Sequence, residues 1–199
     1  MLKNLKSISK FLSLVLRHHP EAIGLKLDAE GWANIEDLVR LAAAHGRSVS
    51  RGLIAEVVRT SEKQRFALKD DGNYIRANQG HSVEVNLNLP PSEPPEVLYH
   101  GTSTRFLNSI KRDGLESRGR RYVHLSSNAH TARMVGSRHG RPVVLKVDAK
   151  QMHADGFVFF LSENGVWLTD GVPPRYISLQ KCEILPEPIC DHKRGDSSR

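Results

Sequence analysis

The sequence lacks the residue patterns on which several common chemistries depend. Its 199 residues include only two cysteines, Cys182 and Cys190, whose spacing matches neither a disulfide framework nor a zinc motif. No apolar run approaches the roughly 20 residues of a membrane-spanning helix. The GxGxxG and GxxxxGK[ST] fingerprints are absent as well, so a Rossmann or P-loop mode of nucleotide binding is unsupported. We expect a cytoplasmic protein without a resident metal.

Acidic residues are also scarce relative to basic ones. Lys and Arg together number 29 against 22 Asp and Glu, which gives a formal net charge of +7 and a pI near 9.6. This excess favours an anionic partner such as nucleic acid, although many basic proteins have no such partner.

A proline-dense stretch, PPSEPP at residues 90–95, divides the chain into halves of similar size. Four prolines within six residues hold the backbone extended and remove hydrogen-bond donors, which is typical of a linker. We therefore expect domains at residues 1–89 and 96–186. A polar tail at residues 187–199 follows, and we expect it to be disordered.

The first half combines helical patterns with one hairpin. Apolar residues recur at helical spacing over residues 7–18, which predicts an amphipathic helix that ends before Pro20. Asn34 and Ser50 are typical N-caps for two further helices. Two short strands flank the DDGN turn at residues 70–73. Helices followed by a hairpin favour a winged-helix-like module, and a small helical scaffold without nucleic-acid binding is the alternative.

The second half contains more strands than helices. Helices are expected near residues 106–112 and 128–137. Short β-type runs occur at residues 97–100, 123–125, 143–147, 157–160 and 166–168. This mixture predicts an α+β domain built around a sheet rather than a series of βαβ units.

Four strings, far apart in the chain, carry the residues best suited to chemistry. They are RHHP at residues 17–20, YHGT at 99–102, VHLS at 123–126 and NGVWLT at 164–169. The first contains an arginine and two histidines, the next two contain one histidine each, and no pair of carboxylates accompanies them. A site of this composition suits a substrate with its own negative charge, and phosphate is the obvious candidate.

The basic residues are ambiguous when taken singly. Arg17 and His18 stand at the expected end of a helix, where a guanidinium can hold a phosphate and a protonated histidine gains from the helix dipole. Arg65 begins the first strand of the hairpin. Three more arginines crowd around two glycines, at Arg133, Arg138 and Arg141. Taken singly, each of these is more typical of a solvated surface residue.

The YHGT and VHLS strings are more specific. Gly101 allows the backbone to approach a ligand closely, and His100 can hydrogen-bond a ribose hydroxyl. His124 repeats this arrangement on another strand end. Two such positions in one small domain favour a nucleotide pocket over two structural histidines.

Taken together, the strings resemble those of the RNA 2′-phosphotransferases (tRNA 2′-phosphotransferases), NAD-dependent enzymes that remove an internal 2′-phosphate from RNA. The resemblance extends from about Ile8 to Ile177. Besides the strings above, it includes SKFLSLVLRHHPEAIGLKLDAEGWANIEDL, TSEKQRF and IRANQGHS. Several long strings in the correct order are far more specific than any one of them.

The resemblance implies a fold and a set of NAD-binding residues. The family joins an N-terminal winged-helix lobe to a C-terminal ADP-ribosyltransferase-like lobe. Its His, His, Val pattern falls here on His100, His124 and Val166. Thr102 and Ser126 would line the ribose and pyrophosphate of NAD, with Gly101 and Leu125 supplying backbone.

The resemblance also implies a catalytic group of Arg, His, Arg and Arg. Arg17 and His18 match the first two from RHHP, because the order of the motif favours His18 over His19, and Arg65 matches the third from KQRF. Arg138, in GSRHG, is our choice for the fourth, with Arg133 and Arg141 as alternatives.

The implied reaction has two steps. The RNA 2′-phosphate attacks the anomeric carbon of the nicotinamide ribose and expels nicotinamide. The neighbouring ribose 2″-hydroxyl then attacks the phosphorus, which releases repaired RNA and ADP-ribose 1″,2″-cyclic phosphate. The arginines would neutralise phosphate charge, and His18 would assist proton transfer in the second step.

Two alternatives remain open from the residues alone. One is an ADP-ribosyltransferase that modifies nucleic-acid phosphate and stops after the first step. The other is a winged-helix RNA-binding module with an inert second lobe. We expect a monomer acting on tRNA-like RNA. A role in tRNA splicing depends on whether the cell makes a 2′-phosphate, which these residues do not reveal.

Overall fold

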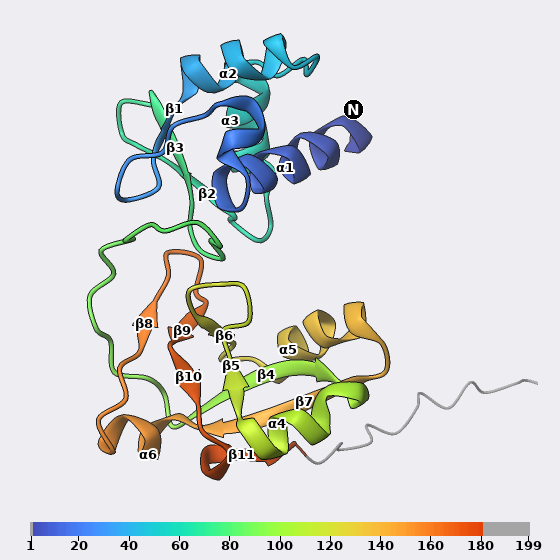
Figure 1. The fold of residues 1–199 in the computed structure, drawn as a ribbon, viewed down its shortest axis with the longest axis vertical. Coiled ribbons are helices and arrows are strands. Elements are labelled where there is room, and N and C mark those ends of the chain that lie inside the picture. The colour runs from blue at the N-terminus through green and yellow to red at the C-terminus, as the bar shows by residue number, and fades with distance from the viewer. Residues whose placement is uncertain (1, 181–199) are drawn as a thin grey trace, which may run out of the picture.

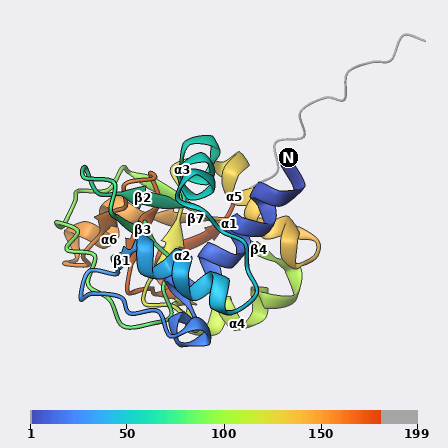
Figure 2. The same ribbon diagram turned by 90° about the horizontal axis from the view of Figure 1, so that it is seen from above.

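The computed structural model describes residues 2–180, and within them the chain forms two halves stacked on one another (Figure 1). From above, the N-terminal helices lie over the strands of the C-terminal half (Figure 2). The expected tail at residues 187–199 and both cysteines fall outside the described residues. Helices and strands are mixed throughout, as the α+β prediction requires. Within residues 2–180, no helix is long and apolar enough to span a membrane.

The N-terminal half consists of three helices and a small antiparallel sheet. The helices are α1 (Leu2–Arg17), α2 (Ile35–Ala44) and α3 (Arg51–Thr60), with a short 3-10 helix, η1, at Pro20–Ile23. The strands are β1 (Ala33–Asn34), β2 (Phe66–Leu68) and β3 (Tyr74–Ala77). They pair in the order β1-β3-β2. Both predicted hairpin strands are present, whereas the two-residue β1 had no recognisable pattern.

The helix ends follow from local side-chain contacts. The Oδ1 atom of Asn34 accepts hydrogen bonds from the first-turn N–H groups of α2, and Ser50 caps α3 in the same way. Helix α1 begins earlier than the predicted residue 7 and ends at Arg17. Beyond it, Pro20 opens η1 instead of extending the helix.

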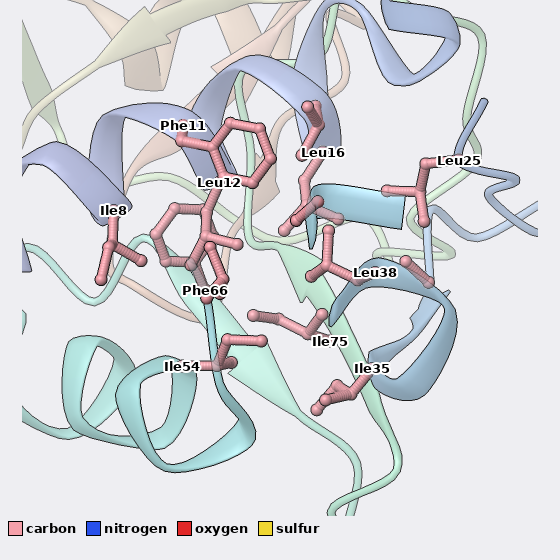
Figure 3. Packing of buried hydrophobic residues seen from close by; sticks show 14 of the residues in the cluster. Ile8, Phe11, Leu12, Leu16, Leu25, Ile35, Leu38, Ile54, Phe66 and Ile75 are labelled. Carbon is pink, nitrogen blue, oxygen red and sulfur yellow. The ribbon is translucent and has the colours of Figure 1, made fainter. Parts of the chain in front are cut away.

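One hydrophobic core holds this half together (Figure 3). Leu12, Val15 and Leu16 form the apolar stripe of α1 and are fully buried. They pack in one cluster with residues of the hairpin, including Phe66 and Ile75. Because Arg17 follows this stripe directly, packing of α1 also fixes where its last side chain emerges.

The C-terminal half contains three small antiparallel sheets. The first has the order β11-β7-β4, from Ile177–Leu179, Pro142–Asp148 and Val97–Ser103. The second has the order β6-β9-β8, from Val123–Leu125, Trp167–Thr169 and Phe160–Leu161. The third pairs β10 (Gly171–Val172) with β5 (Leu115–Glu116).

Three helices and three 3-10 turns connect these strands. The helices are α4 (Leu107–Asp113), α5 (Ala129–Gly136) and α6 (Ala149–Ala154). The 3-10 helices are η2 (Thr104–Phe106), η3 (Ser137–His139) and η4 (Pro174–Tyr176). A second cluster of buried apolar residues, separate from the first, forms the core of this half.

The predicted strand at residues 157–160 is wrong over most of its length. Only Phe160 of that run belongs to a strand, β8. Phe159 is fully buried and its carbonyl accepts a hydrogen bond from the Ser92 N–H, while the Phe157 N–H closes the end of α6. Within this run only Phe159 is buried, Val158 is exposed, and the backbone is partnered mainly outside a sheet.

Helix α5 packs unusually closely on β4. A Cβ atom added at Gly101 would lie 1.6 Å from the carbonyl oxygen of Ala132, and one added at Gly136 would lie 2.6 Å from that of Thr102. Both glycines are thus required for backbone-to-backbone contact between helix and strand. The close approach that Gly101 permits is to α5.

This contact predicts a large effect of a single methyl group. Gly101→Ala should lower the free energy of unfolding by at least about 3 kcal/mol, because the methyl overlaps main-chain atoms that cannot rotate away. Gly52→Ala is the control, since a Cβ at Gly52 in α3 meets nothing within 4 Å and alanine favours helix by up to about 1 kcal/mol. Chemical denaturation of the two variants measures both. Equal stabilities would contradict the packing described here.

Candidate active site

Strand pairing brings three of the four strings to one place. Tyr99 of β4 and Ser126, just after β6, exchange two backbone hydrogen bonds of 2.8 and 2.9 Å. Leu125 of β6 lies opposite Trp167 of β9. Val166 directly precedes that pair in the chain. The histidines of β4 and β6 and the start of β9 therefore converge, as the sequence interpretation required.

His100 presents one ring nitrogen as a hydrogen-bond acceptor. Its Nδ1 lies 3.0 Å from the carbonyl oxygen of His124, and because a carbonyl only accepts, Nδ1 must carry the hydrogen. Burial lowers the pKa of His100, with a smaller lowering from the charge of Arg120. The neutral ring then has its lone pair on Nε2, which suits a ligand hydroxyl.

His124 carries a buried polar atom without a protein partner. Its Nε2 is inaccessible to solvent and makes no hydrogen bond to any described residue. Burial, followed by the charges of Arg120 and Arg17, lowers the pKa of His124 to about 3, so the ring is neutral at physiological pH. A buried polar group of this kind is costly unless something pairs with it. A ligand hydroxyl or amide would supply the missing partner.

The remaining residues of these two strings are held by the scaffold. Thr102 is buried, with its backbone beneath Gly136. The Ser126 hydroxyl contacts the backbone of Asn128, the residue that caps α5. Leu125 is part of the apolar core. No three His, Cys, Asp or Glu side chains gather as a metal site would require anywhere in the described part of the chain.

Arg17 is held by backbone oxygen and an aromatic ring. Its Nη2 donates to the carbonyl oxygen of Arg65 at 3.2 Å, and its guanidinium carbon lies 5.7 Å from the centre of the Phe66 ring. Burial, then the charges of Arg65 and Arg120, lower the pKa of Arg17 to about 10. The group therefore stays cationic at neutral pH. Across residues 2–180 no carboxylate forms an ion pair with it.

His18 is oriented by Ser82. The His18 Nδ1 lies 3.0 Å from the Ser82 Oγ, and the Ser82 backbone N–H donates to the carbonyl of Arg17 at 2.9 Å. Burial lowers the pKa of His18, and the charges of Arg17 and Arg120 add to this effect. His19, by contrast, is exposed and pairs with Glu21 at 2.9 Å. The structure thus gives the two histidines different surroundings.

The charges of Arg65 and Arg138, which come from different halves, both act on Lys63. Both charges contribute to lowering the pKa of Lys63, after the larger effect of its burial. Lys63 and Arg65 belong to the loop between α3 and β2, whereas Arg138 lies in η3, directly after α5. Arg138, our choice for the fourth catalytic position, therefore has a charge that acts on the loop containing Lys63 and Arg65.

Sequence reasoning missed Arg120. This exposed residue lies in the loop between β5 and β6. Its charge lowers the pKa values of four predicted site residues, Arg17, His18, His100 and His124. The signal was present in the sequence, since Arg120 belongs to the basic run RGRR and stands four residues before His124. A basic run beside a histidine string indicates a phosphate site as well as the GSRHG segment does.

Direct contacts join the two halves beside these residues. Glu163, in the turn between β8 and β9, pairs with the buried Arg76 of β3 at 2.5 Å. Asn164 donates from Nδ2 to the carbonyl of Lys63 at 3.1 Å. On the other side, Arg121 donates to the carbonyls of His81 and Val85. These contacts hold the two halves against one another close to the predicted residues.

Comparison with known proteins supplies a family for this site. The profile of the RNA 2′-phosphotransferase, Tpt1 / KptA family matches residues 3–171. Proteins described as probable RNA 2′-phosphotransferases are similar over nearly their whole length. That of Acaryochloris marina is 55% identical over 87% of this chain and 96% of its own. That of Hahella chejuensis is 56% identical over 89% and 95%, and that of Pseudomonas aeruginosa is 54% identical over 88% and 97%.

The buried histidines predict a loss of stability in acid. Burial lowers the pKa of His81 to about 4, helped by the charges of Arg17, His18 and Arg76, and that of His124 to about 3. An unfolded histidine titrates near 6.5. Below that pH the unfolded chain therefore binds protons at these histidines, whereas in the folded chain the same histidines stay neutral. Their effect on the free energy of unfolding is absent above pH 6.5. Towards pH 4 the free energy of unfolding falls, by up to about 1.4 kcal/mol per pH unit for each histidine.

Denaturation curves at pH 7.5, 6 and 5 measure this slope. In His81→Asn the free energy of unfolding should fall less steeply between pH 6 and 5 than in the unmodified protein. Parallel pH dependences of the two proteins would contradict the account of His81.

Proposed function

Because the chain belongs to the RNA 2′-phosphotransferase, Tpt1 / KptA family, we propose how its residues divide the work of that reaction. The protein is an RNA 2′-phosphotransferase, and NAD is the co-substrate of its family. The observation that carries our assignment is the position of Arg120. Its charge acts on Arg17 and His18 of one half and on both histidines of the other.

NAD is assigned to the C-terminal half. The Nε2 of His100 is free to accept a hydrogen bond from a ribose hydroxyl, since its Nδ1 is already used. His124, whose carbonyl pairs with that Nδ1, lies next to it, and its Nε2 has no protein partner within the described residues. The third position, Val166, is apolar, so no carboxylate there repels an incoming phosphate. These features support an ADP-ribosyltransferase-like domain at residues 96–186.

The RNA is assigned to the N-terminal half. The element order α1-β1-α2-α3-β2-β3 and the strand order β1-β3-β2 support a winged-helix-like domain at residues 1–89. Residues 90–95 then form the linker, of which Pro91 forms an isolated β-bridge with Phe160. All the assigned residues come from one chain, so a monomer is sufficient for the reaction.

The 2′-phosphate is assigned to the arginines. Arg17 and Arg65 approach it from the N-terminal half, and Arg120 and Arg138 approach it from the other. Burial, then repulsion from the charges of Arg65 and Arg120, lowers the pKa of Arg17. A bound phosphate dianion relieves this repulsion, because each guanidinium gains an opposite charge beside it. The cluster is therefore arranged for a ligand that brings its own negative charge.

In the first step, the arginines orient a 2′-phosphate oxygen toward the anomeric carbon of the nicotinamide ribose. The new carbon–oxygen bond forms as the bond to nicotinamide breaks, and the displaced electron pair neutralises the positive nicotinamide ring. His100 and His124 hold the sugar during this exchange. Neither histidine needs to transfer a proton, which agrees with their lowered pKa values.

In the second step, the 2″-hydroxyl of the same ribose attacks phosphorus and the RNA 2′-oxygen leaves. One proton is lost by the attacking hydroxyl and one is gained by the leaving oxygen. His18 is assigned to this transfer, since Ser82 fixes its ring and its lowered pKa keeps it neutral and able to accept a proton. The arginines stabilise the charge on phosphorus during the exchange.

The enzyme should convert a 2′-phosphorylated oligoribonucleotide and NAD to 2′-hydroxyl RNA and ADP-ribose 1″,2″-cyclic phosphate. Arg65→Ala should slow the second step by at least about a hundredfold, because that step concentrates charge on the phosphate. Radiolabelled RNA resolved by electrophoresis measures the ADP-ribosylated intermediate, which should accumulate in the variant. Rapid clearance of the intermediate by Arg65→Ala would contradict the assignment.

The two arginines of the C-terminal half that are assigned to the phosphate, Arg120 and Arg138, can be told apart by parallel substitutions. Arg120→Ala should reduce turnover more than Arg138→Ala, because the charge of Arg120 reaches four of the assigned residues. Arg118→Ala, in the same loop, is the matched control and should retain activity, since Arg118 lies 3.9 Å from Glu116 in an exposed ion pair. Steady-state turnover of the three variants decides the matter. A larger loss in Arg138→Ala would assign the fourth arginine to η3.

A further inference from the structure

The string NGVWLT contains an asparagine to which the proposed function gives no role. Asn164 lies in the turn between β8 and β9, two residues before Val166. Its side chain crosses to the other half, where Nδ2 donates to the carbonyl oxygen of Lys63 at 3.1 Å. The contact is between residues 101 positions apart in the chain. It therefore links the wall of the proposed NAD pocket to the loop that carries Arg65.

Three successive carbonyls of that loop are each held by a side-chain donor. Asn164 holds the carbonyl of Lys63. Asn78 donates from its amide to that of Gln64 at 2.8 Å. Arg17 donates to that of Arg65 at 3.2 Å. Three side chains therefore fix the backbone of this short loop between a helix and a strand.

The loop needs this support because its backbone is strained. Gln64 has a φ of +39°, in a region that residues with a side chain seldom occupy. Such a conformation persists only where surrounding contacts fix it, and it concentrates at functional sites. The conformation of Gln64 therefore sets the direction in which the chain enters Arg65, the next residue.

The amide of Asn164 is itself oriented. Because the Lys63 carbonyl can only accept, the amide atom that faces it is Nδ2. The other amide atom, Oδ1, lies 2.8 Å from the hydroxyl of the buried Ser162, which lies equally close to the Val166 carbonyl. The turn thus presents a fixed donor to the loop.

We propose that Asn164 is a positioning residue for Arg65, holding the Lys63–Arg65 backbone so that the guanidinium faces the RNA 2′-phosphate. This inference rests on the proposed role of Arg65 in the second step. It assigns to the C-terminal half, which binds NAD, the task of shaping part of the RNA phosphate site.

The test compares Asn164→Ala with Glu163→Gln in a single-turnover assay that follows both steps. Asn164→Ala should leave the first step and the KM for NAD within about twofold and slow the second step about tenfold, since a misplaced guanidinium loses charge stabilisation at phosphorus. The intermediate would then accumulate. Glu163→Gln is the matched control, because Glu163 lies in the same turn as Asn164. The substitution weakens the contact of Glu163 with Arg76 and leaves the contacts of the Lys63–Arg65 loop intact. It should lower stability and leave the ratio of the two steps unchanged.

A double-mutant cycle separates positioning from general weakening. In an Arg65→Ala background, Asn164→Ala should slow the second step by less than twofold, because the group that it positions is gone. Should Asn164→Ala fail to fold, Asn164→Asp serves in its place: it keeps the contact with Ser162 and sets an oxygen against the Lys63 carbonyl. A change in the step ratio with either variant supports the inference.

Two results would overturn the inference while the proposed function stands. They are an Asn164 variant that behaves like Glu163→Gln, and fully additive effects in the cycle, both with Arg65→Ala accumulating the intermediate. If Arg65→Ala itself accumulates none, the assigned role of Arg65 is wrong and the inference falls with it.

Discussion

The site of this protein depends on holding several positive charges close together without neutralising them. Arg17 is partly buried beside Arg65 and within reach of Arg120. Carboxylates would be the ordinary means of stabilising such a group, yet its partner in the structure is a backbone carbonyl. A carbonyl satisfies the donor without cancelling the charge. The cost of this repulsion is tolerable because the two cores fix the backbone independently.

The same constraint explains why the site is divided between two halves. Cations on one small domain would have to be packed by that domain alone. Here Arg17 and Arg65 are fixed by the core around α1 and the hairpin, while Arg120 and Arg138 belong to the other fold unit. Contacts at Arg76, Asn164 and Arg121 then bring the sets into register. The neutral histidines lie next to this charge, and burial, followed by that charge, lowers their pKa values.

Sequence patterns predicted those parts of the fold that rest on local chemistry. The caps at Asn34 and Ser50, the hairpin after α3, and helices α4 and α5 follow from residue type and spacing. The error at residues 157–160 arose because burial and strand formation leave the same apolar signature. The two-residue strands β1, β5 and β10 exist only through tertiary pairing, so no local pattern could reveal them.

The candidate site was predictable to a similar extent. The convergence of His100, His124 and Val166 was expected from the family resemblance, and strand pairing supplies its physical cause. The contacts of Asn164 and Ser82 could not be read from the chain, because each joins residues more than 60 positions apart. Arg120 was visible in a basic run, but its relation to both halves is a property of the three-dimensional arrangement.

The central claim is that each half binds one substrate, with NAD on one side and the RNA phosphate on the other. Histidine side-chain NMR spectra, recorded with each ligand added alone, test this claim most directly. NAD should shift the resonances of His100 and His124 more than that of His18. An oligoribonucleotide with an internal 2′-phosphate should shift His18 most. A spectrum in which NAD acts chiefly on His18, or the RNA chiefly on His100 and His124, would contradict the account.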